Sequence, residues 1–205
     1  MARLALNKSS LKTERDRLAT YRRFLPSLDL KRQQLLVELK NAERALAARR
    51  REIEEMIASL EGMLALVGAS TMDLSGYVRV RAVELGEENV IGARLPVVSR
   101  TEFALEEYST LAKPFWVDTL VEYLQKASTL RIHEQVEKER FRRLDEAVRK
   151  ITQRVNLFEK VLIPTAEKNI LRIRIYLGDA ERAAVVRSKI VKAKRQQKAT
   201  ERDRG

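Results

Sequence analysis

The first 67 residues carry an apolar side chain at almost every seventh position. Of the ten positions reached in steps of seven from Leu4, nine are apolar and only Arg32 is charged. A strict seven-residue period keeps one apolar seam of a helix facing a partner helix and imposes a left-handed supercoil. The apolar positions are Leu4, Leu11, Leu18, Leu25, Leu39, Leu46, Ile53, Leu60 and Val67. We therefore predict one long coiled-coil helix from about residue 4 to about residue 68.

A second apolar run near the other end of the chain supplies the partner helix. Its members follow uninterrupted spacings of three and four: Phe141, Leu144, Val148, Ile151, Val155, Phe158 and Leu162. The stripe resumes after Pro164, but only after two successive steps of four. Such a stutter locally unwinds a coiled coil.

The segment between the two helices changes its pattern. Turn residues fill 68–75, and two β-rich runs, 77–83 and 90–98, flank a Gly-Glu-Glu-Asn stretch at 86–89. This pattern predicts a β-hairpin with its turn at 86–89, and Pro96 places its strand at an edge. Residues 101–114 read as a short helix or loop, and a long helix follows from about Phe115.

The predicted fold is therefore mainly α: a long antiparallel two-helix coiled coil with a small β-hairpin and short-helix insertion at the far end. The domain bounds that follow are 1–68, 69–114 and 115–205. In an antiparallel pair both chain termini lie at one tip. Pro26 leaves two alternatives for the first helix, a kink or a restart with the proline in its first turn, and the unbroken heptad register favours the kink.

Composition supports long helices over a wide globular core. The chain of 205 residues has only 7 Gly and 4 Pro, and 34% of its residues are charged. It has no Cys, which excludes disulfides and thiolate metal sites and fits a reducing compartment. We find no secretory segment and no stretch long enough to span a membrane. The expected location is cytoplasmic, without direct membrane insertion.

The net charge of +12 calls for an acidic partner. Nucleic acid, anionic lipid and the carboxylates of another protein all meet that requirement, and composition does not choose among them. The excess is concentrated near the C-terminus, where eight Lys and Arg residues between 187 and 204 face only Glu201 and Asp203. A solvated, fraying helix end is the plain structural explanation for this basic segment.

Nothing in the chain resembles a catalytic constellation. The single histidine, His133, lies in a charged stretch, and phosphate-binding loops and metal-ligand spacings are missing. Neighbouring carboxylates such as Glu54 and Glu55 do not share a helix face. We therefore predict no catalytic residue, no metal site and no cofactor.

The most specific string is Arg-Val-Asn-Leu-Phe-Glu-Lys-Val-Leu-Ile-Pro at 154–164. It resembles the C-terminal signature of the D subunit of V-type and archaeal-type rotary ATPases, in which an Arg-Val-Asn triplet, a Glu three residues after the Asn and an Ile-Pro pair recur. The opening helix from Asn7, the hairpin at 77–96 and the basic segment 187–192 are also similar to that family. The chain departs from the family at Lys8-Ser9, where Pro-Thr is usual, and at Pro26.

The resemblance implies a non-catalytic rotor shaft that couples ATP synthesis or hydrolysis to proton or sodium transport. Its partners would be the catalytic and regulatory head subunits, a small rotor subunit in the stalk and a connector to the membrane rotor, with the chain peripheral on the cytoplasmic face of the membrane. Nucleic acid is not expected. The residues that we predict to contact partners are Arg154, Asn156, Glu159 and Pro164 of the signature, Arg187, Lys189, Lys192, Lys194 and Arg195 of the basic tip, and Val78, Val80, Val90, Ile91 and Leu95 of the hairpin.

Two functions of other classes stay open on the residues alone. A basic coiled coil that binds nucleic acid would account for the charge and would lose affinity steeply with salt. Against it, acidic residues interleave with the basic ones and no base-reading module is present. A membrane-surface or cytoskeletal rod would need a lipid-facing helix or extended repeats, whereas the heptads stop at a hairpin.

Overall fold

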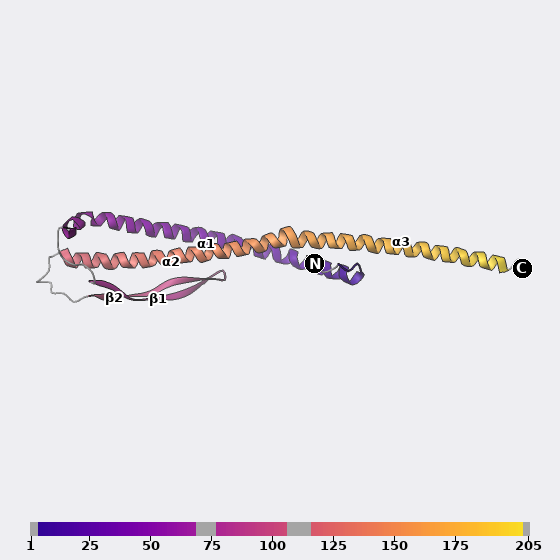
Figure 1. The fold of residues 1–205 in the computed structure, drawn as a ribbon, viewed down its shortest axis with the longest axis horizontal. Coiled ribbons are helices and arrows are strands. Elements are labelled where there is room, and N and C mark those ends of the chain that lie inside the picture. The colour runs from indigo at the N-terminus through magenta and orange to yellow at the C-terminus, as the bar shows by residue number, and fades with distance from the viewer. Residues whose placement is uncertain (1–3, 69–76, 106–115, 203–205) are drawn as a thin grey trace. The chain divides into compact units, whose positions relative to one another are not determined.

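The computed structural model describes residues 4–68, 77–105 and 116–202. In order, the elements are helix α1 (Lys8–Gly68), strands β1 (Val78–Val90) and β2 (Ala93–Leu105), helix α2 (Trp116–Leu157), a π-helical turn η1 (Phe158–Leu162) and helix α3 (Ile163–Arg202) (Figure 1). The predicted mainly α fold with one antiparallel hairpin is confirmed. Of the predicted turn at 68–75, Gly68 ends α1 and the rest lies outside the described residues. The prediction of a short helix or loop at 101–114 is wrong for residues 101–105, which belong to strand β2, and 106–114 lie outside the described residues.

The chain forms two compact units. Residues 1–29 and 153–205 make up the first, the terminal unit, which holds the start of α1, η1 and α3. Residues 30–152 make up the second, the hairpin unit, which holds the rest of α1, the hairpin and most of α2. Each unit therefore joins helical segments that are far apart in the sequence, as the two-helix prediction requires. The three-part domain division by residue ranges stays a prediction.

Helix α1 begins at Lys8 because Asn7 caps it. The Asn7 Oδ1 atom accepts a hydrogen bond of 2.7 Å from the backbone N–H of Ser10. An N-cap Asn satisfies a backbone donor that the first turn leaves unpaired, and it stops the helical conformation from extending toward the N-terminus. The predicted start near residue 4 is therefore wrong by one turn, since the heptad pattern runs on past the cap.

Pro26 lies inside α1, so a helix restart at this position is excluded. Proline has no backbone N–H, and the Arg22 carbonyl consequently loses its usual intrahelical donor. The Ser27 hydroxyl donates a 2.8 Å hydrogen bond to the Phe24 carbonyl in the same turn. The boundary between the two units follows shortly after, at Asp29.

The apolar seam continues through the hairpin unit. On α1 the buried residues are Ile53 of the seven-residue series that starts at Leu4, and Leu35 and Ala42, which lie three residues after members of that series. On α2 the buried residues Leu144, Val148 and Ile151 follow the predicted spacing. At the end of the unit near the start of α2, a cluster of Tyr77, Trp116, Val117, Leu120 and Val121 closes the core.

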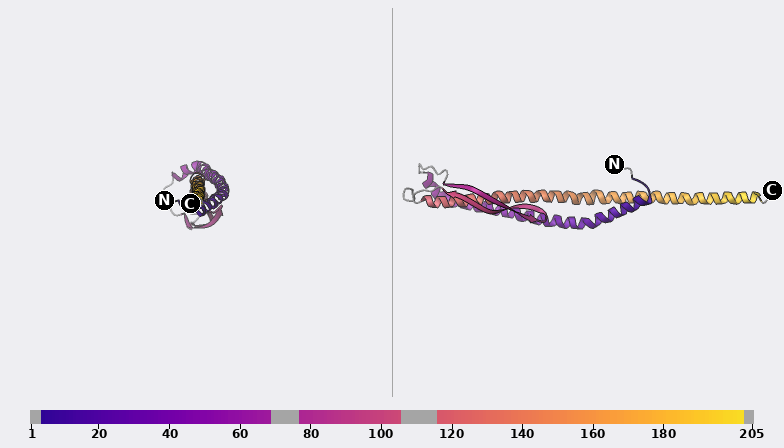
Figure 2. Two further views of the ribbon diagram at one scale, coloured as in Figure 1. Left: turned by 90° about the vertical axis from the view of Figure 1, so that its right-hand side faces the viewer. Right: turned by 90° about the horizontal axis from the view of Figure 1, so that it is seen from below.

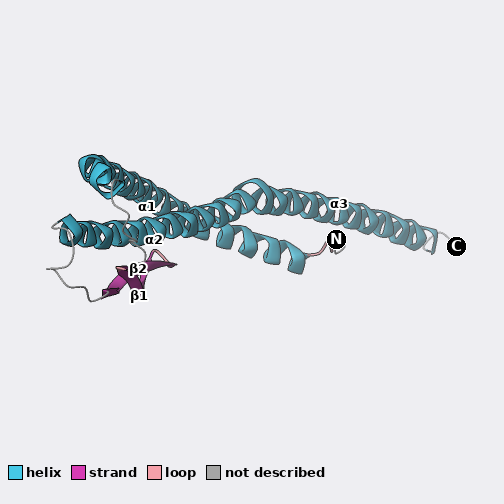
Figure 3. Ribbon diagram, turned by 60° about the vertical axis from the view of Figure 1, so that its left-hand side comes forward, coloured by secondary structure: helices cyan, strands magenta, loops and turns pink. Residues whose placement is uncertain are grey.

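The hairpin turns at a different place from the one predicted. Strand β1 runs through residues 86–89, and the tight turn lies at Ile91 and Gly92, whose φ angles are 53° and 84°. Figure 3 shows the two strands of the hairpin beside each other. Gly92 supplies the left-handed conformation, and its N–H donates a 2.8 Å hydrogen bond to Asn89 Oδ1. Gly86 serves a different purpose, because a Cβ there would lie 2.8 Å from Ser99 Oγ. Two register shifts, with Arg81 as the extra residue in β1 and Ser99 as the extra residue in β2, hide the simple alternation of apolar residues.

The terminal unit has the same kind of seam. Ile173 is fully buried, and Val155, Ala166 and Ile170 are buried with it. Burying one such aliphatic side chain contributes about 1.5–3 kcal/mol. The Tyr21 ring of α1 meets the Phe158 ring edge to face, with 5.5 Å between the centroids.

A wide helical turn precedes Pro164. The N–H of Ile163 bonds to the carbonyl of Phe158, five residues back, which makes Phe158–Leu162 a π-helical turn. Pro164 cannot donate to Lys160 and crowds that carbonyl, and a π turn accommodates both defects without breaking the helix. This turn lies before the proline, whereas the stutter predicted after Pro164 stays a prediction.

One charged side chain lies in the seam of the terminal unit. Glu14 is only 7% exposed; its carboxylate accepts hydrogen bonds from Arg17 Nη1 (2.8 Å) and from Asn169 Nδ2 (3.2 Å). The Asn169 bond joins α1 to α3. A polar pair in an apolar seam is satisfied only in one register, so this pair fixes how the two helices are aligned.

We predict that Asn169→Leu lowers thermal stability, whereas Glu14→Leu with Asn169→Leu raises it above that of the single variant. The single change leaves a buried carboxylate with one partner fewer, and the double change removes the charge from the seam. A double-mutant cycle measured by circular dichroism should give a coupling of about 1 kcal/mol. Strictly additive effects would mean that the two side chains do not interact.

Candidate functional site

In the C-terminal part of α3, every residue from 179 to 197 is exposed. Lys8, the first residue of α1, lies 4.0 Å from Glu181, and α3 runs on beyond that point to Arg202 (Figure 1). The start of α1 and the end of α3 therefore do not lie together, which corrects the prediction of a shared tip. The reason is length, since the start of α1 at Lys8 leaves the end of α3 without a counterpart in α1.

The predicted basic tip lies on this overhanging segment. All five of its cations are exposed: Arg187, Lys189, Lys192, Lys194 and Arg195. No ion pair between described residues involves any of them. Four apolar side chains, Val185, Val186, Ile190 and Val191, are about half exposed on the same segment. The tip thus offers both positive charge and apolar area to a partner.

Some residues of the signature string at 154–164 are buried in the helical pair, and others are exposed. Arg154 and Glu159 are exposed, and Asn156 and Pro164 are half-buried. Val155 is buried in the seam and Phe158 contacts Tyr21. The string therefore shapes the helix around η1, and its exposed charged members are the ones that can meet another protein.

Within the hairpin unit, the hairpin runs alongside the helices in the right-hand view of Figure 2. Val80 is 44% exposed, and Val78, Val90 and Ile91 are half-buried. Leu95 is only 1% exposed, so its side chain cannot form part of a partner surface and is removed from the predicted set. Val83, Leu85 and Val97, which sequence reasoning did not select, are exposed instead.

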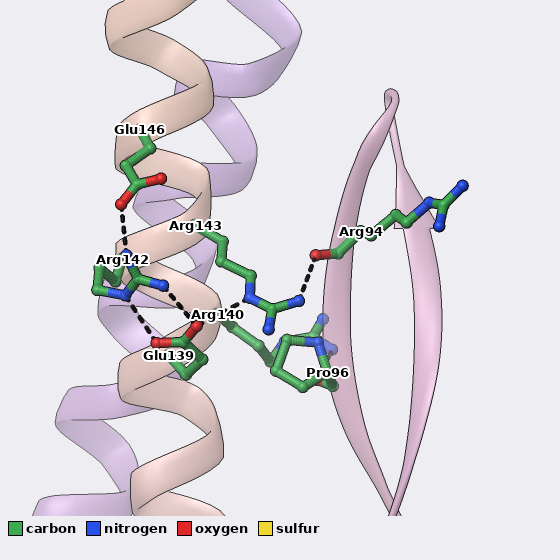
Figure 4. Close-up of polar contacts among 7 residues, drawn as sticks. All are labelled: Arg94, Pro96, Glu139, Arg140, Arg142, Arg143 and Glu146. Atoms are coloured by element: carbon green, nitrogen blue, oxygen red, sulfur yellow. Dashed lines mark hydrogen bonds and ion pairs between the residues drawn. The ribbon is translucent and has the colours of Figure 1, made fainter.

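Two arginines of α2 hold β2 in place (Figure 4). Arg140 donates from Nη1 to the Pro96 carbonyl (3.1 Å) and from Nη2 to Glu88 (3.0 Å). Arg143 donates from Nη1 to the Arg94 carbonyl at 3.1 Å. We call Arg140 and Arg143 the arginine clasp. Their i, i+3 spacing on a helix was visible in the sequence, but their acceptors are backbone atoms that no residue pattern reveals.

Glu139 orients one arm of the clasp. Its carboxylate receives hydrogen bonds from Arg142, which also contacts Glu146, and from Arg143 (2.8 Å) (Figure 4). These bonds, with Arg142 first, lower the pKa of Glu139 from 4.5 to about 2. Arg131 and then Arg50 of α1 similarly lower the pKa of Glu134.

The described residues contain no group of three or more His, Asp or Glu side chains placed to hold a metal ion. In the same parts of the chain, we find no helix with the length and apolar character of a membrane span. His133 is half-buried on α2. Two exposed surfaces are candidates for binding a partner: the tip of α3, and the outer side of the hairpin with its exposed residues Val80, Val83, Leu85 and Val97.

These features define a class: an antiparallel helical coiled-coil protein whose exposed surfaces suit protein partners. The family model for the ATP synthase D subunit matches residues 10–193. The D subunit of the V-type ATP synthase of Borreliella burgdorferi is 34% identical over 193 residues, which cover 94% of this chain and 95% of the relative. The corresponding D subunits of Chlamydia felis and Chlamydia caviae are 34% and 32% identical, over 98% of this chain and 97% of each relative. The chain belongs to the family of ATP synthase D subunits.

The pKa of Glu139 predicts how its ion pairs respond to acid. Since its pKa is lower in the folded chain than its ordinary value of 4.5, its contribution to stability is present above about pH 4.5 and is lost as the pH falls toward 2. Glu139→Gln should remove this contribution. The stability difference between wild type and variant, from denaturant titrations at several pH values, should shrink over that window. A difference that does not change with pH would contradict the assignment.

We predict that Arg140→Gln loosens the hairpin and leaves the helices intact. The change removes a charged donor to the Pro96 carbonyl and to Glu88, which is worth about 1–2 kcal/mol. Amide hydrogen exchange should accelerate across β1 and β2. Arg149→Gln, which removes a cation whose acidic partner, Asp145, lies on α2 itself, is the matched control. Equal effects of the two substitutions would rule out the clasp as the specific cause.

Proposed function

We propose that this chain is the non-catalytic central-stalk subunit of a V-type or archaeal-type ATPase, which couples ATP synthesis or hydrolysis in the catalytic head to proton or sodium transport by rotation. The observation that carries the proposal is the match to V-type D subunits over nearly the full chain, together with a coiled coil whose basic end has no partner within the described residues.

The helical pair suits a shaft that transmits torque. A continuous seam from Leu35 to Ile53 on α1, and from Leu144 to Ile151 on α2, joins two helices within a narrow cross-section. Such a shaft influences three equivalent catalytic sites in turn, because each orientation presents a different part of its surface and shifts the population of site conformations. No residue of this chain is required to touch nucleotide.

The tip of α3 is the proposed contact with the head. Its cations would meet acidic residues that line the head, and its exposed valines and Ile190 would meet apolar ones. The exposed charged residues of the signature, Arg154 and Glu159, are proposed to contact the same assembly beside η1, where the half-buried Asn156 and Pro164 shape the helix. Nucleic acid is a poorer partner, because acids such as Glu167 and Glu181 already pair with neighbouring cations.

The hairpin is the proposed contact for the other stalk subunits. Its outer surface carries the exposed Val80, with Val83 and Leu85 along β1, beside the half-buried Val78, Val90 and Ile91. An apolar strand with an unpaired edge binds another protein readily. The partners that we propose are a small rotor subunit and the connector to the membrane rotor. The complex would then lie on the cytoplasmic face of the membrane with this chain peripheral to it.

We predict that neutralising the tip weakens coupling. Changing its five cations to Gln should lower the affinity of the head for this chain about 10-fold, because each lost surface ion pair contributes up to about 1 kcal/mol. ATP hydrolysis by the reconstituted complex should fall at limiting concentrations of the chain. The control neutralises five exposed cations of the hairpin unit: Lys31, Lys40, Arg44, Arg51 and Lys150. Unchanged hydrolysis by the tip variant would show that the tip is not the head contact.

A further inference from the structure

A basic groove runs between the start of α1 and the middle of α3 in the terminal unit. It consists of two adjoining hollows, of about 460 and 630 Å³, which share Arg15 and Arg174 as lining residues. The first is bounded by Leu18 and Ala19 of α1, and the second by Lys12 of α1 and Gly178 of α3. It is separate from the exposed tip, which begins beyond Glu181.

Three cations of the groove are not neutralised inside it. Its other two cations have acidic partners, since Lys8 lies 4.0 Å from Glu181 and Arg22 lies 2.6 Å from Glu167. Within the described residues, no ion pair involves Lys12, Arg15 or Arg174. Asp16 is the one further acid that lines the hollows. The groove therefore keeps a positive charge that a partner can neutralise.

The floor of the groove is apolar. Leu18 is half-buried, Ile170 is buried, and Leu171 is 60% exposed beside Arg174. Guanidinium groups above aliphatic side chains suit a ligand with both carboxylates and an apolar side chain. The acids around the groove would repel a continuous polyanion such as nucleic acid, which favours a peptide with localised charge.

We propose that this groove binds an acidic segment of a head subunit, with at least two carboxylates for Arg15 and Arg174 and an aliphatic side chain for Leu171. The proposal rests on the proposed function, and it adds a second contact with the head beside the tip. Arginine forms paired hydrogen bonds with carboxylates, so the two arginines would fix the orientation of the segment as well as attract it.

The first experiment measures binding of the full chain to the catalytic head prepared without its stalk, across a salt series. Arg15→Glu with Arg174→Glu should raise the Kd about 10-fold and make its salt dependence shallower. The control, Arg23→Glu with Arg172→Glu, makes the same charge change at exposed positions that do not line the groove. Circular dichroism shows whether each variant keeps its helices. If both variants weaken binding equally, or neither does, the groove proposal is wrong, whereas failure of the wild type to bind the head would overturn the proposed function itself.

A second experiment identifies the occupant and does not depend on charge reversal. Because the chain has no cysteine, Ala19→Cys places a single thiol in the first hollow. A thiol-specific photo-cross-linker on it should capture a head peptide rich in Asp and Glu in the assembled complex. Capture of a peptide without clustered acids, or no capture from a complex that hydrolyses ATP normally, would overturn the proposal.

Discussion

Burial of one narrow apolar seam is the interaction on which the rest of this protein depends. Most of the stability of a helix in a protein comes from packing one face against a partner, and 34% of the residues of this chain are charged. Pairing removes Leu35 and Ile53 from water in the hairpin unit and Ile170 and Ile173 in the terminal unit. Since the seam is so narrow, many side chains remain outside it, and these form the tip, the groove and the outer side of the hairpin.

Polar contacts fix how the paired elements are aligned with each other. The Glu14 and Asn169 pair satisfies a buried carboxylate in one register only, and the arginine clasp holds the backbone of β2 against α2 at Pro96 and Arg94. An apolar seam by itself tolerates sliding by whole heptads, whereas a buried carboxylate does not. A shaft that presents different surfaces in different orientations needs this fixed alignment.

The irregularities inside the helices have local causes, namely the two prolines. Pro164 removes a donor and is preceded by a π turn, while Pro26 stays within an unbroken α1. The chain accepts both defects because the seam holds the helices on either side. The charged residues Arg154 and Glu159 of the signature are exposed near η1, so this short string both shapes the helix and places charge on the surface.

The heptad spacing by itself determined the mainly α fold, the two long helices and the seam residues, because a sustained period of seven is typical of a helix that pairs with another helix. The family signature at 154–164 could also be read directly, and so could the positive charge of the tip. The hairpin turn could not be predicted, because a bulge in each strand disguised the alternation and two glycines competed for one turn. Only tertiary structure decided that Gly92 makes the turn, that Leu95 is buried, that Arg140 and Arg143 bind backbone carbonyls, and that Arg15 and Arg174 share a groove. Each of these depends on which atoms distant segments bring together, and a residue pattern carries no information about such distances.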